Sequence, residues 1–237
     1  SAEPRVETIP ISAENFPDTI FRKYVSDTFD ADKDAVLSPE EISSVTSVSV
    51  RLKGIQDLKG IEYFSNLKYL NAELNYLKTL DVSKNTKLES IIVANNRLTS
   101  IKLPNDNRND TLVYLDVFAN GLQELNVHNL FALGFIHVDD NELTTLDLSD
   151  SPLQDGHGFV AMNNYLESIT QQWHAVSLER VFDAPARYSR IYIRGMVYPA
   201  DRRRKMAGGE SGKRGYDALR PVCAYPISGS VRWERRR

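Results

Sequence analysis

Apolar positions recur along residues 67–148 with a period of about 21 residues, counted from the chain itself. Each of four successive blocks has Leu or Ile at its first and fourth places, and Ala or Val at its sixth. Aliphatic residues return at the eleventh, fourteenth and sixteenth places. The ninth place is always asparagine, at Asn75, Asn96, Asn120 and Asn141. A fixed period of this size is the signature of a solenoid built from stacked coils.

The pattern L-x-x-L-x-x-x-x-N-x-L resembles the leucine-rich repeat family, because seven positions recur in step. The resemblance implies an α/β solenoid with short parallel strands on its concave side. Degenerate blocks flank the clear ones: the first has Lys53 in the asparagine place, and the last has Asn164. We therefore expect about six coils within residues 45–176.

The ninth-place asparagines are predicted to turn inward. Their amides can bond backbone groups of their own turn and of the next coil, which would form a ladder along the solenoid. The segments after the sixteenth place are short and polar. For these we expect turns or a second short strand on the convex side.

The third, fifth and seventh places of each coil are expected to face solvent on the concave side, and the eighth place adds Asp140. Aromatic and aliphatic residues stand there although the core does not require them, interleaved with acids and one histidine. Such a cluster is typical of an interaction surface. Alternatively, C-terminal residues fold back and cover it. The candidate ligand-binding residues are Tyr69, Asn71, Glu73, Ile92, Tyr114, Asp116, Phe118, Phe135, His137, Asp139 and Met162.

An N-terminal cap is predicted over residues 1–44. Apolar residues from Phe16 to Phe29 follow helical spacing, and Pro17 suits the first turn of a helix. An amphipathic helix ending near Phe29 would cover the open end of the repeat core, as terminal repeats require.

The twelve residues from Asp30 to Glu41 resemble the calcium loop of EF-hand and dockerin-type proteins, although Ala35 replaces the usual glycine. The resemblance implies calcium as a cofactor. A purely structural role is also open, because Ser38 and Glu41 would form a helix capping box. The oxygen ligands implied are Asp30, Asp32, Asp34, the carbonyl of Val36, Ser38 and Glu41.

The cap and the repeats together resemble secreted internalin-like repeat proteins of bacteria. The cap segment is Asn15–Val25 joined to Phe29–Ile42, and with the repeats the resemblance covers roughly residues 12–170. It implies a secreted or surface-attached protein of bacterial origin. The first residues are not a signal peptide, so secretion would require one that has been removed.

Charge divides the chain near residue 180. Residues 1–179 hold 14 Lys and Arg against 27 Asp and Glu, whereas residues 180–237 hold 15 against 5. We interpret residues 177–237 as a basic, Arg-rich C-terminal cap or tail, partly disordered. Nucleic acid is an unlikely partner for this tail, because no stacking platform or nucleic-acid motif accompanies the charge. The tail could instead bind the chain's own acidic face, or reflect a recombined or truncated reading frame without a selected role.

No catalytic motif is apparent, and a single cysteine at Cys223 excludes an intrachain disulfide. No apolar run is long enough for a transmembrane helix. The sequence therefore predicts a non-enzymatic adhesion module that binds a host protein or a glycan through the concave face. The alternative is a scaffold that positions a carbohydrate-active or other partner enzyme, with a calcium-stabilised cap. The sequence does not indicate an oligomeric state.

Overall fold

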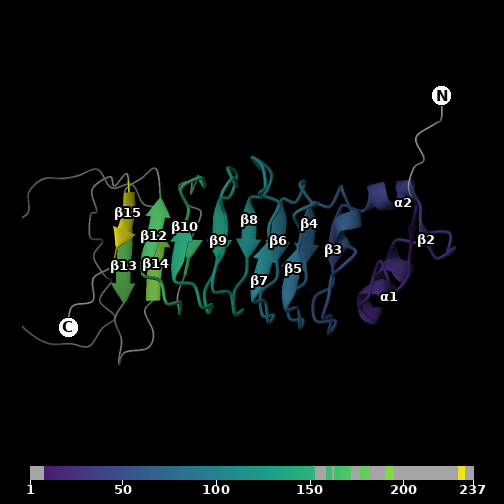
Figure 1. The fold of residues 1–237 in the computed structure, drawn as a ribbon, viewed down its shortest axis with the longest axis horizontal. Helices are drawn as coiled ribbons and strands as arrows, with labels where there is room; N and C mark the ends of the chain where they lie inside the picture. Colours follow the sequence, from purple (N-terminus) through teal and green to yellow (C-terminus); the bar gives the residue numbers. More distant parts are fainter. Residues whose placement is uncertain are drawn as a thin grey trace, which may run out of the picture.

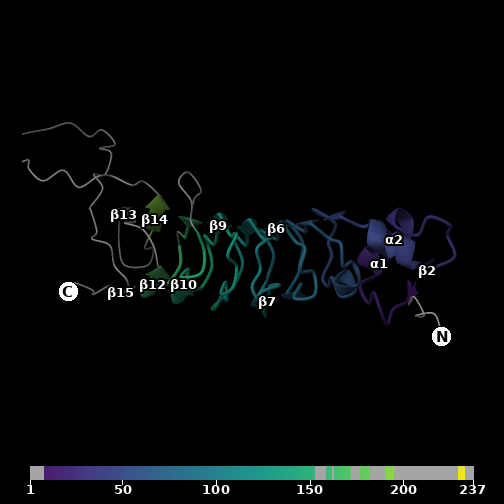
Figure 2. The ribbon, with the colours of Figure 1, turned by 90° about the horizontal axis from the view of Figure 1, so that it is seen from above.

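The structure is a computed structural model that describes residues 8–152, 159–161, 163–171, 177–181, 190–194 and 229–232. From residue 168 onward it describes the backbone alone. The chain forms an elongated solenoid, with the N-terminal cap at one end and the C-terminal strands at the other (Figure 1). The view from above shows the coils stacked along the same axis (Figure 2).

One parallel sheet lines a whole side of the solenoid, as the repeat predicts. Within the described part of the chain, six strands pair in register, one from each coil. The solenoid fold with parallel strands is thereby confirmed. The strands are β3 (Ser47–Ser49), β4 (Tyr69–Asn71), β6 (Ser90–Ile92), β8 (Tyr114–Asp116), β9 (Phe135–His137) and β11 (Phe159–Val160).

A second set of short strands is centred on the fourteenth place of several coils. On this side β5 (Thr79–Asp81) pairs with β7 (Ser100–Lys102), and β10 (Thr145–Asp147) pairs with β12 (Ser168–Gln171), each in parallel. The polar segments after the sixteenth place, such as residues 83–87 and 149–152, contain turns, which is the first of the two predicted alternatives. Within the described residues, α-helix occurs only in the N-terminal cap, and a 3-10 turn, η1 (Ile61–Tyr63), lies in the first coil.

The core is a column of aliphatic side chains that runs through the coils. The fourth-place residues at the centre of each strand are fully buried. They are Val48, Leu70, Ile91, Leu115 and Ile136. Because side chains alternate along a strand, burial of the fourth place leaves the third and fifth places on the outer face of the sheet.

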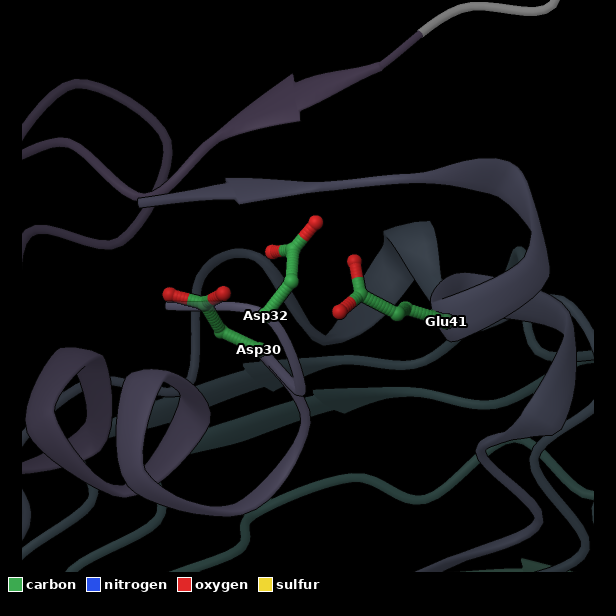
Figure 3. Close-up of side chains that lie close together, drawn as sticks. All are labelled: Asp30, Asp32 and Glu41. Carbon is green, nitrogen blue, oxygen red and sulfur yellow. The ribbon is translucent and has the colours of Figure 1, made fainter. Parts of the chain in front are cut away.

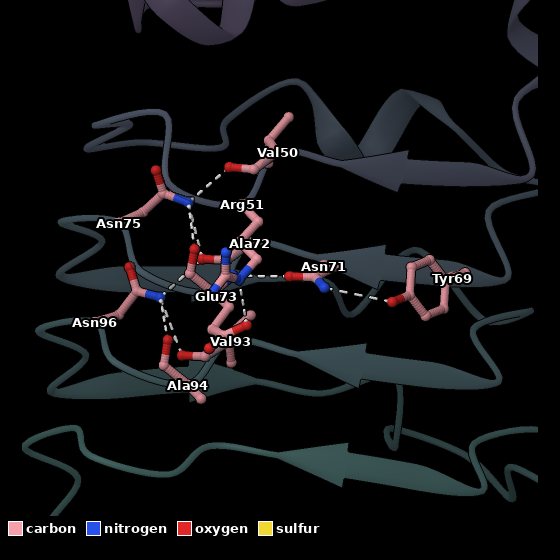
Figure 4. Close-up of polar contacts among 10 residues, drawn as sticks. All are labelled: Val50, Arg51, Tyr69, Asn71, Ala72, Glu73, Asn75, Val93, Ala94 and Asn96. Carbon is pink, nitrogen blue, oxygen red and sulfur yellow. Dashed lines mark hydrogen bonds and ion pairs between the residues drawn. The ribbon is translucent and has the colours of Figure 1, made fainter.

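The ninth-place asparagines form the expected ladder, as Asn75 illustrates. Its Nδ2 donates to the carbonyl of Val50 in the preceding coil at 2.8 Å and to Ala72 in its own coil at 2.9 Å (Figure 4). Its Oδ1 accepts the backbone N–H of Ile55, also in the preceding coil, at 3.0 Å. Asn96, drawn beside it, repeats these bonds one coil further on.

The prediction that each amide reaches the next coil is wrong in direction. The carbonyl at the sixth place of one coil points toward the following coil, so the following asparagine supplies the donor and reaches backward. This direction also accounts for Lys53 in the first coil, because the cap rather than a repeat precedes it. Asn164 bonds Val138 in the same way, so the degenerate last coil keeps the ladder.

The residue before each ladder position has a left-handed backbone. Their φ angles lie between 52° and 58°, in a region that side chains other than Asn, Asp and Gly seldom adopt. Leucine occupies this eighth place in two adjacent coils, at a conformational cost of roughly 1–2 kcal/mol each. The residues are Leu52, Leu74, Asn95, Ala119, Asp140 and Asn163.

The N-terminal cap contains helix α1 (Thr19–Thr28), which buries Phe21 and Val25 against the end of the core. Asp18 caps this helix: its Oδ1 accepts the N–H groups of Ile20 and Phe21. Its other oxygen, Oδ2, accepts N–H groups from Gln56 and Asp57 of the first coil. One carboxylate therefore joins the cap to the repeats. The predicted helix ending near Phe29 is confirmed.

The rest of the cap folds around the loop that follows α1. Strand β1 (Ile9–Pro10) pairs antiparallel with β2 (Val36–Leu37), and helix α2 (Pro39–Ser44) leads into the first coil. Beyond the last coil, β14 (Arg190–Arg194) lies antiparallel to β11, and β13 (Ser177–Val181) pairs with β14. β15 (Gly229–Arg232) pairs with β12. Cys223 and most of the Arg-rich tail lie outside the described residues.

Candidate ligand-binding face

The outer face of the parallel sheet carries the third, fifth and seventh places of every coil. The strand pairing sets the third-place residues side by side, so that each contacts the equivalent residue of the next coil. We call this set the third-place row. In order from the cap it contains Ser47, Tyr69, Ser90, Tyr114 and Phe135.

Two rings of this row are stacked. The centroids of Tyr114 and Phe135 lie 4.6 Å apart, and their planes differ by only 6°. Each aromatic of the row also leans along its own strand toward the fifth place. The amide of Asn71 donates to the Tyr69 hydroxyl at 3.4 Å (Figure 4), and Phe135 makes an edge contact with the ring of His137.

His137 lies between two carboxylates. Its Nδ1 is 3.3 Å from Asp116 of the preceding coil, and its Nε2 is 3.4 Å from Asp139. Phe118 stacks on the imidazole with centroids 5.0 Å apart. The hydrogen bonds to Asp116 and Asp139 raise the pKa of His137 to about 9, so the ring is a cation at neutral pH.

Three of the candidate ligand-binding residues, Asp116, His137 and Asp139, thus lie together. The geometry does not suit a metal ion, because the two carboxylates approach opposite nitrogens and do not converge on one point. Burial and the charge of Asp116 raise the pKa of Tyr114, so its phenol stays neutral.

Not every seventh-place residue faces solvent as predicted. Asp139 is only 4% exposed, and Ala94 is 3% exposed. Glu73 follows the prediction more closely, because it is half-buried and pairs with Arg51 of the first coil at 2.8 Å (Figure 4). Ile92 is half-buried, and Met162 lies outside the described residues.

The cap loop brings together three of the four carboxylates among the predicted calcium ligands. Asp30, Asp32 and Glu41 have carboxylate oxygens within 4.8 Å of one another (Figure 3). Asp34 is not part of this group and instead accepts the N–H of Val36.

Asp30 is the buried member of the carboxylate group. It is 1% exposed: its Oδ2 accepts the N–H of Ala35 at 3.2 Å, and its Oδ1 is buried without a hydrogen-bond partner. Ala35 has a φ of 67°, the left-handed conformation that favours glycine at this place. The loop therefore adopts the backbone expected of a calcium loop despite the missing glycine.

Glu41 serves the local structure as well. Its Oε2 accepts the N–H of Ser38 at 2.8 Å, and the Ser38 hydroxyl accepts the N–H of Glu41, which completes the capping box of α2. Its Oε1 accepts the N–H of Ala31 from across the loop at 2.6 Å. Hydrogen bonds from the backbone of Ser38 and Ala31 hold the pKa of Glu41 below its ordinary value. The structural and the calcium interpretations of Glu41 are therefore compatible.

Two features of the face and cap escaped the sequence analysis. The left-handed eighth place was not anticipated, although Asn and Asp at three of its six positions were a usable signal. The double role of Asp18 was also missed, because its partners Gln56 and Asp57 lie 38 and 39 residues away. This long-range contact has no local sequence signature.

The in-register parallel sheet, the repeat and the asparagine ladder together define a leucine-rich repeat protein. No family model matches the chain. It is 34% identical over 71 residues to internalin J of Listeria monocytogenes serotype 4b, a match that covers 30% of this chain and 8% of that protein.

Solved structures give the same similarity. The functional domain of InlJ from Listeria monocytogenes matches with a TM-score of 0.56 and 29% identity, over 63% of this chain and 32% of that chain. The internalin InlF of the same species matches with a TM-score of 0.46 and 19% identity, over 72% of this chain and 66% of that chain. The chain is thus an internalin-like leucine-rich repeat protein, and it spans about a third of the InlJ domain. That domain includes a cysteine ladder, whereas this chain has one cysteine and joins its coils through asparagines.

Proposed function

We propose that the chain is a non-enzymatic binding module that recognises a protein through the outer face of its parallel sheet. The observation that carries this proposal is the third-place row with its stacked pair, Tyr114 and Phe135, beside the Asp116–His137 pair. The core is already complete without these residues, since the fourth-place aliphatics fill it. Tyrosine and phenylalanine provide large contact areas with few rotatable bonds, which suits protein recognition.

Protein is favoured over glycan as the ligand because of how the rings are arranged. A sugar ring binds well to an exposed aromatic face, whereas the faces of Tyr114 and Phe135 that meet are covered by each other. Stacked rings present their edges to a ligand. Edges bordered by carboxylates and an imidazolium suit the mixed polar and apolar surface of a protein.

We place this module on the bacterial cell surface or outside the cell, by analogy with the internalin proteins that it resembles. In the part of the chain that the structure describes, no helix is long and apolar enough to cross a membrane.

The proposal is tested by binding to a panel of purified extracellular proteins and to a glycan array. The variant Tyr114→Ala/Phe118→Ala removes two aromatic contacts from the face. Tyr165→Ala is the matched control, because Tyr165 is a 66% exposed tyrosine outside the strands of the sheet. A protein ligand that the double variant loses and the control retains supports the proposal. Binding that the double variant keeps in full refutes the assignment of the face.

A second proposal concerns calcium in the cap. Asp30 supports it, because a buried carboxylate oxygen without a partner is costly unless a cation or donor meets it. Asp32 and Glu41 lie close enough to share an ion with it. Calcium bound there would neutralise the clustered carboxylates and stiffen the loop between α1 and α2. The same cap would serve the alternative function, a scaffold that positions a partner enzyme.

Calorimetric titration with calcium chloride tests the cap site. Asp30→Asn preserves the size of the side chain and an acceptor for Ala35 but removes the charge, so it should abolish the heat and the thermal shift. Magnesium chloride is the ionic control, because the smaller ion demands a stricter octahedral arrangement. Absence of both heat and thermal shift in the parent protein would end the calcium proposal.

A further inference from the structure

The third coil places no aromatic ring on the outer face of the sheet. Its third, fifth and seventh places are Ser90, Ile92 and Ala94. The second coil presents Tyr69 and Asn71 beside it on one side. On the other side the fourth coil presents the outward side chains of Tyr114, Asp116 and Phe118. The third coil therefore lies, without a ring of its own, between two coils that each present a tyrosine.

The third-place row has no aromatic ring at this strand, because Ser90 occupies the position. Ser90 pairs with Tyr69 on one side and Tyr114 on the other, so two tyrosines stand two strand spacings apart, about 9.6 Å. Phe135 shows what a ring on a neighbouring strand does: it stacks on Tyr114 at 4.6 Å. A planar group above Ser90 would lie at a similar distance from both tyrosines.

Both tyrosines have polar groups close by. The Tyr69 hydroxyl meets Asn71 of its own strand (Figure 4), and Tyr114 is close enough to Asp116 and to Tyr69 for their charges to act on it. Tyr69 is 36% exposed and Tyr114 is half-buried. Phe135 covers one face of the Tyr114 ring, and the strand that carries Ser90 lies on the opposite side.

The polar group beside this position is acidic. The contacts of Asp116 to His137 and to the N–H of Phe118 both use Oδ1, so Oδ2 is the oxygen that a ligand donor would reach. A planar cation fits both requirements, because its faces are attracted to tyrosine rings and its edge donates to a carboxylate. Arginine is the side chain that combines these properties.

We propose that the position above Ser90, between Tyr69 and Tyr114, receives an arginine guanidinium from the protein ligand, with Asp116 as its carboxylate partner. This inference rests on the proposed function of the face and specifies the chemistry of its ligand. Acidic residues predominate over residues 1–179, which also favours a basic contact.

The test uses the full chain and the peptide acetyl-Gly-Arg-Gly-amide, followed by NMR of the tyrosine ring protons. We expect the peptide to shift the rings of Tyr69 and Tyr114. Acetyl-Gly-Lys-Gly-amide should bind about 10-fold more weakly or worse, because an ammonium group cannot stack as a plane. Equal binding of the lysine peptide, tighter binding of acetyl-Gly-Trp-Gly-amide, or no shift of these two rings would overturn the inference.

Ser90→Phe closes the position with a ring from the chain itself. Aromatic cross-strand neighbours are tolerated or stabilising in a sheet, so we expect the variant to fold and to lose peptide binding about 10-fold or more. Ser47→Phe is the matched control, because Ser47 also neighbours Tyr69 in the third-place row but has no second tyrosine beyond it. Peptide binding should survive in the control.

If Ser90→Phe fails to fold, Tyr69→Leu removes one ring face and gives the same readout. A protein ligand that Tyr114→Ala/Phe118→Ala abolishes and Ser90→Phe leaves intact overturns this inference and spares the proposed function. Arginine-peptide binding that Ser90→Phe abolishes supports the inference, even if no protein of the panel binds the face.

Discussion

Replacing Asn75 tests the ladder on which the solenoid depends. Asn75 is 3% exposed, and its amide bonds the Val50 carbonyl and the Ile55 N–H of the preceding coil. Asn75→Ala removes the amide, so both backbone groups lose a hydrogen-bond partner. Each buried group left unpaired costs about 1–3 kcal/mol. We therefore expect the free energy of unfolding to fall by about 2–6 kcal/mol.

Asn75→Asp separates the donor from the acceptor function. The aspartate keeps an oxygen for the Ile55 N–H but replaces the Nδ2 donor with an oxygen that faces the carbonyls of Val50 and Ala72 at 2.8 and 2.9 Å. At pH 7 this charged variant should be less stable than Asn75→Ala. Burial beside two carbonyls should raise the pKa of the new carboxyl above that of an unfolded aspartate. The loss of stability relative to the parent should therefore shrink as the pH falls toward 4, where protonation restores a donor.

Equilibrium denaturation in urea measures these differences, with the slope checked for a change in cooperativity because coils of a solenoid can uncouple. Asn66→Ala is the control: Asn66 is an asparagine of the first coil whose side chain bonds a single backbone group, the carbonyl of Ser43, near the surface. Its cost should stay within about 0.5 kcal/mol. The reasoning about the ladder fails if Asn75→Ala costs no more than Asn66→Ala, or if Asn75→Asp matches the parent at pH 7.

Three further predictions follow from single positions. Leu74→Gly relieves the strain of the left-handed backbone, so it should raise the free energy of unfolding by up to about 1 kcal/mol in thermal denaturation. The control Leu77→Gly should lower the free energy of unfolding sharply. A destabilised Leu74→Gly would contradict the backbone argument. The folded-state pKa of His137 is raised from 6.5 to about 9, so the contribution of this residue to stability should be complete below pH 6.5 and be lost as the pH rises through 9. If the difference in the free energy of unfolding between the parent and His137→Phe does not change with pH across this window, the charge pair is excluded. Asp18→Ala removes the cap of α1 and its link to the first coil, and it should cost about 2–4 kcal/mol and expose the cap to proteolysis before the repeats.

The sequence predicted the coils and their outer face because the repeat marks the same place in every coil. Once the ladder asparagines are aligned, the fourth place must be buried, and the neighbours of each outward residue are known. The contact between Asp116 and His137 follows directly, since both occupy the fifth place of adjacent coils. The register of the repeats thus converts a one-dimensional pattern into lateral contacts between coils.

Details that depend on backbone direction were not predictable in this way. The repeat places an inward amide at Asn75, but the direction in which the sixth-place carbonyl points decides whether it bonds the preceding or the following coil. The burial of Asp139 was not predictable either, because the seventh place is exposed at Arg51 and half-buried at Glu73 although a left-handed residue follows each of them. In the cap, the sequence indicated the order of the carboxylates, yet only the folded loop leaves one oxygen of Asp30 buried and unpartnered.

Leu52 and Leu74 are two positions where the sequence conflicts with the local backbone. A sequence optimised only for its fold would place Asn, Asp or Gly in the left-handed eighth position, as three of the six described coils do. Leucine there is disfavoured by its backbone, and Leu52 is also 67% exposed, so neither the turn nor the core explains it. Both residues directly follow the Arg51–Glu73 pair at the border of the proposed binding face. Local conflicts of this kind are expected where function rather than stability selects the residue. On this argument the face extends beyond the aromatic row toward the first two coils, and Leu52→Asn should weaken ligand binding while it stabilises the fold.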